Sequence, residues 1–146
     1  MPRLVERNVI NVKRRSRKKR MYEYRSHLVK IIDGDTIDVD LDLGFGVVLK
    51  KQRIRLHGIN TPESRTRDLE EKKYGLAAKA RLRELLEEAD TIMVTTAIDK
   101  KARGKYGRIL GTVFADKTNV NNLLVDEGHA IAYYGGTKRT NKWWKE

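Results

Sequence analysis

Arg-Leu-His-Gly-Ile-Asn-Thr-Pro-Glu, residues 55–63, is the stretch from which the fold and the chemistry of this chain are most directly predicted. Apolar and charged residues alternate up to Leu56, which is the period-two pattern of a strand. Pro62 then prevents further pairing in a sheet and keeps Thr61 extended. A cation, an amide, a hydroxyl and a carboxylate therefore follow one another at the exit of a strand, where a rigid sheet can position them.

The pattern of the surrounding chain predicts an α+β fold that is mainly β. Asp38, Asp40 and Asp42 alternate with apolar residues, which indicates a strand with a solvated acidic face. The period becomes helical after Tyr74, whereas residues 64–73 are polar and aperiodic and are expected to form a surface loop. We expect strands over residues 22–32, 37–43, 47–59, 91–97, 109–114 and 130–134, and helices over residues 74–89 and 119–128. Because strands and helices do not alternate regularly, this order favours a small, partly open antiparallel barrel.

Charge is concentrated at the N-terminus of the 146-residue chain. Residues 1–20 contain nine Lys or Arg and one Glu, so they carry +8 of the net charge of +12. We therefore expect residues 1–21 to form a basic flexible tail and residues 22–146 to form one folded domain. The tail has three open interpretations: a nucleic-acid-binding arm, a localisation signal, or a solubilising segment.

The composition also excludes several structural features. The chain has no cysteine, which excludes disulfides and thiolate metal sites. It has no apolar run of the roughly 20 residues that a membrane span needs, and no signal-peptide pattern. We therefore expect a monomer with no membrane partner, in an intracellular or phage-encoded setting.

Three motifs together predict phosphodiester hydrolysis. Asp35 in Asp-Gly-Asp-Thr (33–36), the Asn60 side chain and the Thr61 carbonyl are oxygen ligands that suit Ca²⁺ or Mg²⁺. Glu63 follows closely and is placed to orient or deprotonate a water molecule. Arg55 and, in Lys-Tyr-Gly-Arg (105–108), Arg108 are bidentate donors suited to a phosphate whose charge grows in the transition state. Each residue alone has an ordinary structural explanation, but the combination favours a nuclease.

The chain resembles the staphylococcal (micrococcal) nuclease, or thermonuclease-like, family over about residues 22–134. The resemblance rests on five motifs in matching order, at residues 33–36, 55–63, 71–75, 105–108 and 125–128. It implies a five-stranded OB-fold barrel with helices packed against it. It also implies Ca²⁺-dependent cleavage of DNA and RNA that leaves 3′-phosphate ends, with Mg²⁺ or Mn²⁺ as alternative ions.

The resemblance also implies roles for individual residues. Asp35 and the Thr61 carbonyl match metal ligands, and Glu63 matches the general base. Arg55 and Arg108 match the two phosphate-binding arginines. The residues that match positions beside the nucleotide are Lys105, Tyr106 and one of Tyr133 and Tyr134, which compete for a single role.

The chain departs from the family pattern in three ways, of which the third matters most for function. The hairpin between Asp35 and Arg55 is longer, the C-terminal helix is short or missing, and Asn60 stands where the family has aspartate. Loss of that charge predicts weaker metal binding, since a unit charge pair at ~4 Å is worth roughly 4 kcal/mol at an effective dielectric of about 20. The alternative to a nuclease is a related OB module that binds nucleic acid or protein without cutting.

Overall fold

The computed structural model describes residues 21–97, 108–133 and 143–145. The strands are β1 (Met21–Asp33), β2 (Thr36–Gly44), β3 (Val47–Leu56), β4 (Ile59–Asn60), β5 (Ile92–Ala97), β6 (Ile109–Ala115), β7 (Thr118–Asn119) and β8 (Ile131–Ala132). The helices are α2 (Leu69–Glu88), α3 (Val120–Asp126) and a short 3-10 helix, η1 (Trp143–Lys145). The predicted basic tail, Lys105, Tyr106 and Tyr134 lie outside the described residues.

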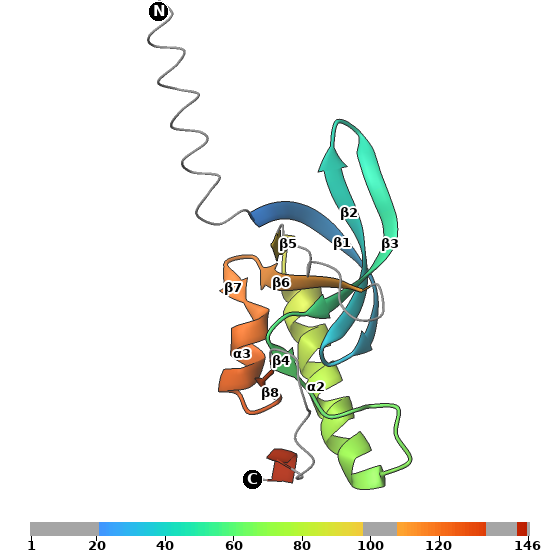
Figure 1. Ribbon diagram of the computed structural model, residues 1–146, viewed down its shortest axis with the longest axis vertical. Coiled ribbons are helices and arrows are strands. Elements are labelled where there is room, and N and C mark those ends of the chain that lie inside the picture. Colours follow the sequence, from blue (N-terminus) through green and yellow to red (C-terminus); the bar gives the residue numbers. More distant parts are fainter. Residues whose placement is uncertain (1–20, 98–107, 134–142, 146) are drawn as a thin grey trace, which may run out of the picture.

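The five longer strands form a closed barrel (Figure 1). β1 pairs antiparallel with β2 and β5, β2 pairs with β3, and β5 pairs with β6. The barrel is closed by a parallel pairing of β3 with β6, in which Ile54 lies opposite Ile109. The predicted OB-like α+β barrel is therefore confirmed, but the expectation that it is partly open and wholly antiparallel is wrong at this seam. No local pattern identifies two strands that meet across more than 50 residues of chain.

A glycine allows the barrel to close at the β3–β6 seam. Leu56 pairs with Gly111 there, and a Cβ atom on Gly111 would lie 2.9 Å from Val94 Cγ1 and 3.2 Å from Ile54 Cγ2. Such contacts are tighter than a packed core accepts without rearrangement. The barrel interior is filled mainly by fully buried aliphatic side chains: Ile37, Val39, Ile54, Leu56, Val94 and Val113.

Helix α2 covers the end of the barrel near the β1–β2 turn, as Figure 1 shows. Its buried residues, Gly75, Ala78, Leu82 and Leu86, recur every three or four positions and so lie along one face. The helix begins at Leu69, inside the stretch expected to be a loop. Asp68 is the reason, because its side chain accepts hydrogen bonds from the first free backbone N–H groups of the helix, those of residues 70 and 71.

A bidentate ion pair joins α2 to the end of α3. Arg81 Nε and Nη2 donate to Glu127 Oε1 and Oε2 at 2.7 and 2.9 Å, and Arg81 Nη1 donates to Glu84 Oε2 at 3.1 Å. The hydrogen bonds from Arg81 lower the pKa of the Glu127 carboxyl. Neither α2 nor any other helix within the described ranges has the length and apolar character needed to cross a bilayer.

The acidic face predicted for β2 is only partly solvated. Asp38 is 2% exposed and accepts hydrogen bonds from Arg53 Nε and Nη2 at 2.9 and 3.2 Å. These bonds raise the pKa of the Arg53 guanidinium. Asp38 is buried because Arg53, opposite it on β3, compensates its charge.

Candidate active site

The β1–β2 turn and the exit of β3 are held together by main-chain contacts. Thr36 pairs with Arg55 across the β2–β3 ladder, and the Leu56 N–H donates to the Asp35 carbonyl at 2.8 Å. The turn also packs tightly, because a Cβ on Gly34 would lie 3.0 Å from Thr61 Oγ1. The two stretches singled out in the sequence, 33–36 and 55–63, therefore form one surface.

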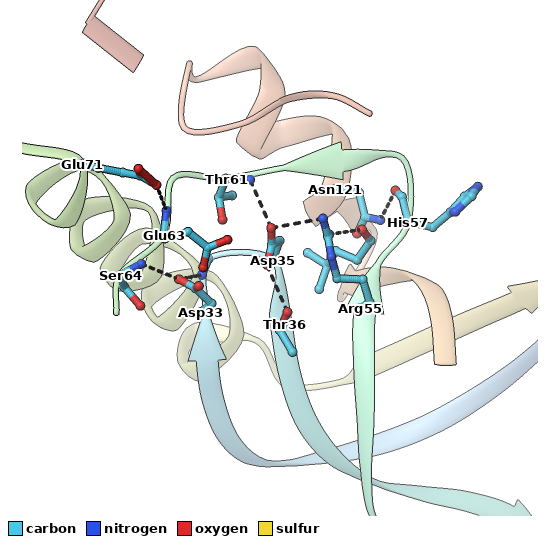
Figure 2. A network of polar contacts seen from close by, with 12 residues as sticks. Asp33, Asp35, Thr36, Arg55, His57, Thr61, Glu63, Ser64, Glu71 and Asn121 are labelled. Carbon is cyan, nitrogen blue, oxygen red and sulfur yellow. Dashed lines mark hydrogen bonds and ion pairs between the residues drawn. The ribbon is translucent and has the colours of Figure 1, made fainter. Parts of the chain in front are cut away.

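Asp35 is the centre of the polar network in Figure 2. Its Oδ2 atom accepts a hydrogen bond from the Thr61 N–H at 3.1 Å and lies 3.3 Å from Arg55 Nη2. Its Oδ1 atom accepts from Thr36 Oγ1 at 3.0 Å. The Asp35 and Arg55 side chains are each only 10% exposed. A largely buried carboxylate is thus compensated by a cation and by two hydrogen-bond donors, which also fix its orientation.

Arg55 is itself oriented by the main chain. Its Nη1 atom donates to the Leu56 carbonyl at 2.8 Å while Nη2 faces Asp35. Two contacts on one planar guanidinium leave little freedom of rotation. The arginine is therefore preorganised beside the carboxylate.

Glu63 lies on a segment that is held between the β1–β2 turn and α2. The next residue, Ser64, donates its N–H to Asp33 Oδ1 at 3.3 Å, and the Glu63 N–H donates to Glu71 Oε2 at 3.0 Å. Gly75 of α2 lies beneath it, and a Cβ there would be 2.4 Å from the Glu63 carbonyl oxygen. The Glu63 side chain is exposed, and Figure 2 shows it on the same side of the turn as Asp33 and Asp35.

Asn121 on α3 is a site-supporting residue that the sequence did not identify. Its Oδ1 atom accepts from the Val113 N–H at 3.1 Å, and its Nδ2 atom donates to the His57 and Gly111 carbonyls at 2.9 and 3.2 Å. The side chain is 3% exposed, and the His57 N–H also donates to the Gly111 carbonyl at 2.8 Å. One amide therefore ties the segment after β3 to β6 and α3. An asparagine in a short helix has no sequence pattern that indicates this role.

Arg108 stands immediately before β6, the parallel neighbour of β3. Arg55 pairs with Leu110, so Arg108 is two positions away along the strand direction. Residues two apart share a face of a sheet, and paired residues point to the same side. Continued one residue before the strand, this alternation would place the half-buried Arg108 on the face that carries Arg55.

The last element of the site comes from the C-terminal part of the chain. β8 pairs with β4, with Asn60 opposite Ile131, and the Tyr133 N–H donates to the Gly58 carbonyl at 2.8 Å. Tyr133 is thus adjacent to the 55–63 stretch. Its competitor for the nucleotide-binding role, Tyr134, lies outside the described residues, as do Lys105 and Tyr106.

The donor set beside Asp35 fits a hard cation in its chemistry. Asn60 and Thr61 are buried, the Thr61 N–H contacts Asp35, and Thr61 Oγ1 is a buried oxygen with no hydrogen-bond partner within the described residues. Carboxylate, amide, carbonyl and hydroxyl oxygens are ligands typical of Ca²⁺ and Mg²⁺. The described part of the chain contains no cluster of three or more His, Cys, Asp or Glu side chains arranged around a metal position. The set is therefore poor in negative charge, with Asp35 as its one carboxylate.

Comparison with known proteins identifies a family for this chain. Residues 53–144 match the family described as "Staphylococcal nuclease homologue". A micrococcal nuclease of Shigella flexneri is 34% identical over 122 residues, which cover 76% of this chain and 59% of that protein. A thermonuclease of Staphylococcus hyicus is 33% identical over 107 residues, covering 73% and 58%.

A third relative shows how the same region occurs within a longer protein. Endonuclease YhcR of Bacillus subtilis is 30% identical over 118 residues, covering 77% of this chain and 9% of that protein. The chain thus spans less than two thirds of the length of each of these three relatives.

Proposed function

The chain belongs to the family of staphylococcal nuclease homologues, and from that premise we propose that it is a metal-dependent nuclease that hydrolyses phosphodiester bonds of DNA, RNA or both. The observation that supports this most strongly is the contact of Asp35 with both Arg55 and the Thr61 N–H. Asp35 is 20 and 26 positions before Arg55 and Thr61, so the fold brings a carboxylate, a guanidinium and the exit of β3 side by side. We further propose that the products carry 3′-phosphate ends.

We assign the chemistry to side chains on the surface of the barrel around Asp35. Arg55 and Arg108 bind the phosphate and stabilise the charge that builds on its oxygens during the reaction. Glu63, exposed on a clamped segment, accepts a proton from the attacking water. Tyr133, and Lys105, Tyr106 and Tyr134 from the undescribed segments, are proposed to contact the nucleotide.

The proposed cation is Ca²⁺, with Mg²⁺ or Mn²⁺ as alternatives. Asp35, Asn60 and the carbonyl of Thr61 would hold it. When bound, a divalent ion would supply positive charge against the phosphate oxygens. Asp35 keeps acceptor capacity for such an ion, because a carboxylate has about four lone-pair sites and Arg55, Thr61 and Thr36 occupy three of them.

Asn60 favours a second candidate function, that of a module that binds nucleic acid without cutting it. The residue is buried, and it stands at the position where the family pattern has a carboxylate. A site with fewer negative charges binds a divalent cation less tightly. The two functions therefore differ in whether the remaining ligands suffice at cellular metal concentrations.

A cleavage assay separates these functions. Supercoiled plasmid, single-stranded DNA and single-stranded RNA are incubated with the protein and Ca²⁺, Mg²⁺, Mn²⁺ or EDTA. We expect cleavage with at least one of the ions and none with EDTA. We also expect a phosphatase to remove one phosphate from the 3′ end of each product. Binding without cleavage at every metal concentration would refute the nuclease function and support the binding module.

A further inference from the structure

The hairpin of β2 and β3 extends well beyond the barrel and ends in an uncharged tip (Figure 1). Residues 43–49 contain no charged side chain. Phe45 at the end of the tip is fully exposed. The other exposed apolar residues of the tip are Leu43, Val47, Val48 and Leu49. We call residues 43–49 the hairpin tip.

The backbone of the tip presents Phe45 outward. Gly44, Phe45 and Gly46 have φ values of 81°, 57° and 75°, all in the left-handed region. A bulky residue is unfavourable in that conformation, which turns usually fill with Gly, Asn or Asp. The aromatic ring therefore gains nothing from the local backbone and nothing from packing within the hairpin, and its position favours contact with another molecule.

The stem of the hairpin, residues 38–42 and 50–53, carries three acidic and three basic residues, so its net charge is zero, and two ion pairs join four of them. Lys50 Nζ lies 3.4 Å from Asp40 Oδ2, the Lys51 N–H donates to Asp40 Oδ1 at 2.8 Å, and Arg53 is bound to Asp38. The hydrogen bond from Lys51 lowers the pKa of the Asp40 carboxyl. The stem of the hairpin is therefore not suited to bind a partner through charge. The surface available for binding is the aromatic ring of Phe45 with the apolar residues around it.

The stem disfavours a second copy of the chain as the partner. β3 pairs with β6 only through Ile54–Leu56, so residues 47–53 form an edge strand. Lys50 and Lys51 lie on that edge, and Lys51 adopts a left-handed φ of 49°, which interrupts a regular ladder. Charged residues and irregularities of this kind protect an edge from pairing with another strand.

We propose that the hairpin is an arm that contacts the nucleic-acid substrate at a distance from the site, with Phe45 stacked on a base or wedged between two bases. This inference rests on the proposed nuclease function. β3 extends from Val47 at the tip to Leu56, so the same strand carries the end of the arm and Arg55. The net charge of +12 attracts a polyanion to the chain as a whole. An aromatic ring that stacks on any base adds affinity without sequence preference.

The length of the arm defines which substrates it reaches. Arg55 is eight positions after Val47, which at about 3.3 Å per position corresponds to ~26 Å. That length matches about eight nucleotides at ~3.4 Å per step of one strand. A substrate of four nucleotides bound at Arg55 does not reach Phe45, whereas one of thirty nucleotides does.

The test combines binding and cleavage with two lengths of substrate. Wild type, Phe45→Ser, Phe45→Trp and the control Val29→Thr, an exposed apolar residue on β1, are titrated by fluorescence anisotropy in EDTA with 30-nucleotide single-stranded DNA and a 30-base-pair duplex. Cleavage of the same DNA and of a tetranucleotide is measured with Ca²⁺. Urea unfolding verifies that each variant is folded.

We expect Phe45→Ser to weaken binding of 30-nucleotide DNA between about fivefold and more than a hundredfold, the range for loss of one base–aromatic stack. Its kcat/KM on long DNA falls accordingly, its cleavage of the tetranucleotide is unchanged, and Phe45→Trp and Val29→Thr behave as wild type. If Phe45→Ser binds long DNA as tightly as wild type, the proposal that the hairpin contacts the substrate is refuted. It is also refuted if the variant loses as much cleavage activity on the tetranucleotide as on long DNA.

Two further measurements identify a different partner. If sedimentation shows a wild-type dimer that Phe45→Ser dissociates, or if Phe45 controls binding to phosphatidylserine vesicles but not to DNA, the nucleic-acid arm is overturned. A wild type that binds long DNA through Phe45 but cleaves nothing refutes the nuclease function and leaves the arm intact. Failure of the arm and failure of the proposed function therefore give different results.

Discussion

Asn121→Ala removes the side chain that joins the His57 carbonyl, after β3, to β6 and α3. The variant leaves the Val113 N–H and the His57 carbonyl without their side-chain partner, while the Gly111 carbonyl keeps the hydrogen bond from the His57 N–H. The loss of a partner for the buried Val113 N–H costs about 1–3 kcal/mol, and the loss for the part-buried His57 carbonyl costs less. We therefore expect the free energy of unfolding to fall by ~2–5 kcal/mol, out of the roughly 5–15 kcal/mol typical of a small domain.

Urea unfolding followed by circular dichroism measures this loss as a shift in midpoint at constant m-value. The control is Asn122→Ala, which changes the next and exposed asparagine of α3 and should stay within about 0.5 kcal/mol of wild type. Asn121→Asp keeps the acceptor for Val113 but turns a negative charge toward two carbonyls, so it should destabilise at least as much as alanine. A cost below ~1 kcal/mol for Asn121→Ala would refute the reasoning, because it would mean that both orphaned groups find other partners.

Three other substitutions test the metal site, the packing under Glu63 and the pH dependence of stability. Asn60→Asp should tighten Ca²⁺ binding about tenfold, equivalent to ~1.4 kcal/mol, in isothermal titration; an unchanged Kd would mean that residue 60 does not face the ion. Gly75→Ala should lower the free energy of unfolding, measured in urea, by about 1–3 kcal/mol, because its Cβ would overlap the Glu63 carbonyl, although alanine favours helices. Stability equal to or higher than that of wild type would show that the segment around Glu63 moves to accommodate the methyl group. Arg81 lowers the pKa of Glu127, so this group stabilises the fold above the unfolded pKa of about 4.3, and that contribution is lost as the pH falls through the folded pKa. The melting temperature of wild type should therefore drop more than that of Glu127→Gln below about pH 4, and parallel curves would contradict the role of the pair.

The parts of the site that the sequence predicted well are those in which local pattern and chemistry coincide. Asp35 follows a strand, Arg55 ends one, and Pro62 terminates the pairing, so each residue's position on an element was readable from its neighbours. The structure places Asp35, Arg55 and Thr61 in contact, with Asn60 as the residue before Thr61. Their roles in metal binding and catalysis remain predictions.

The features that were missed depend on contacts between distant residues. Asp38 has the alternation of a solvated residue, yet Arg53, 15 positions later, allows it to be buried. Asp68 starts a helix within a polar stretch, because capping depends on backbone geometry that composition does not reveal. The parallel β3–β6 pairing and the hydrogen bonds of Asn121 likewise join segments that have no shared sequence pattern.

The central claim is that the chain hydrolyses phosphodiester bonds with Glu63 as the general base. The single-turnover cleavage rate of Glu63→Gln at saturating Ca²⁺ tests this claim most directly. Glu63 is exposed, so the substitution should leave folding intact, and Glu88→Gln on the exposed face of α2 is a matched control. The account predicts that the Glu63→Gln rate falls by about 10²–10⁴, the contribution of a general base, while Glu88→Gln cleaves at the wild-type rate. A Glu63→Gln rate close to that of wild type would contradict the assignment of the base and, with it, the proposed mechanism.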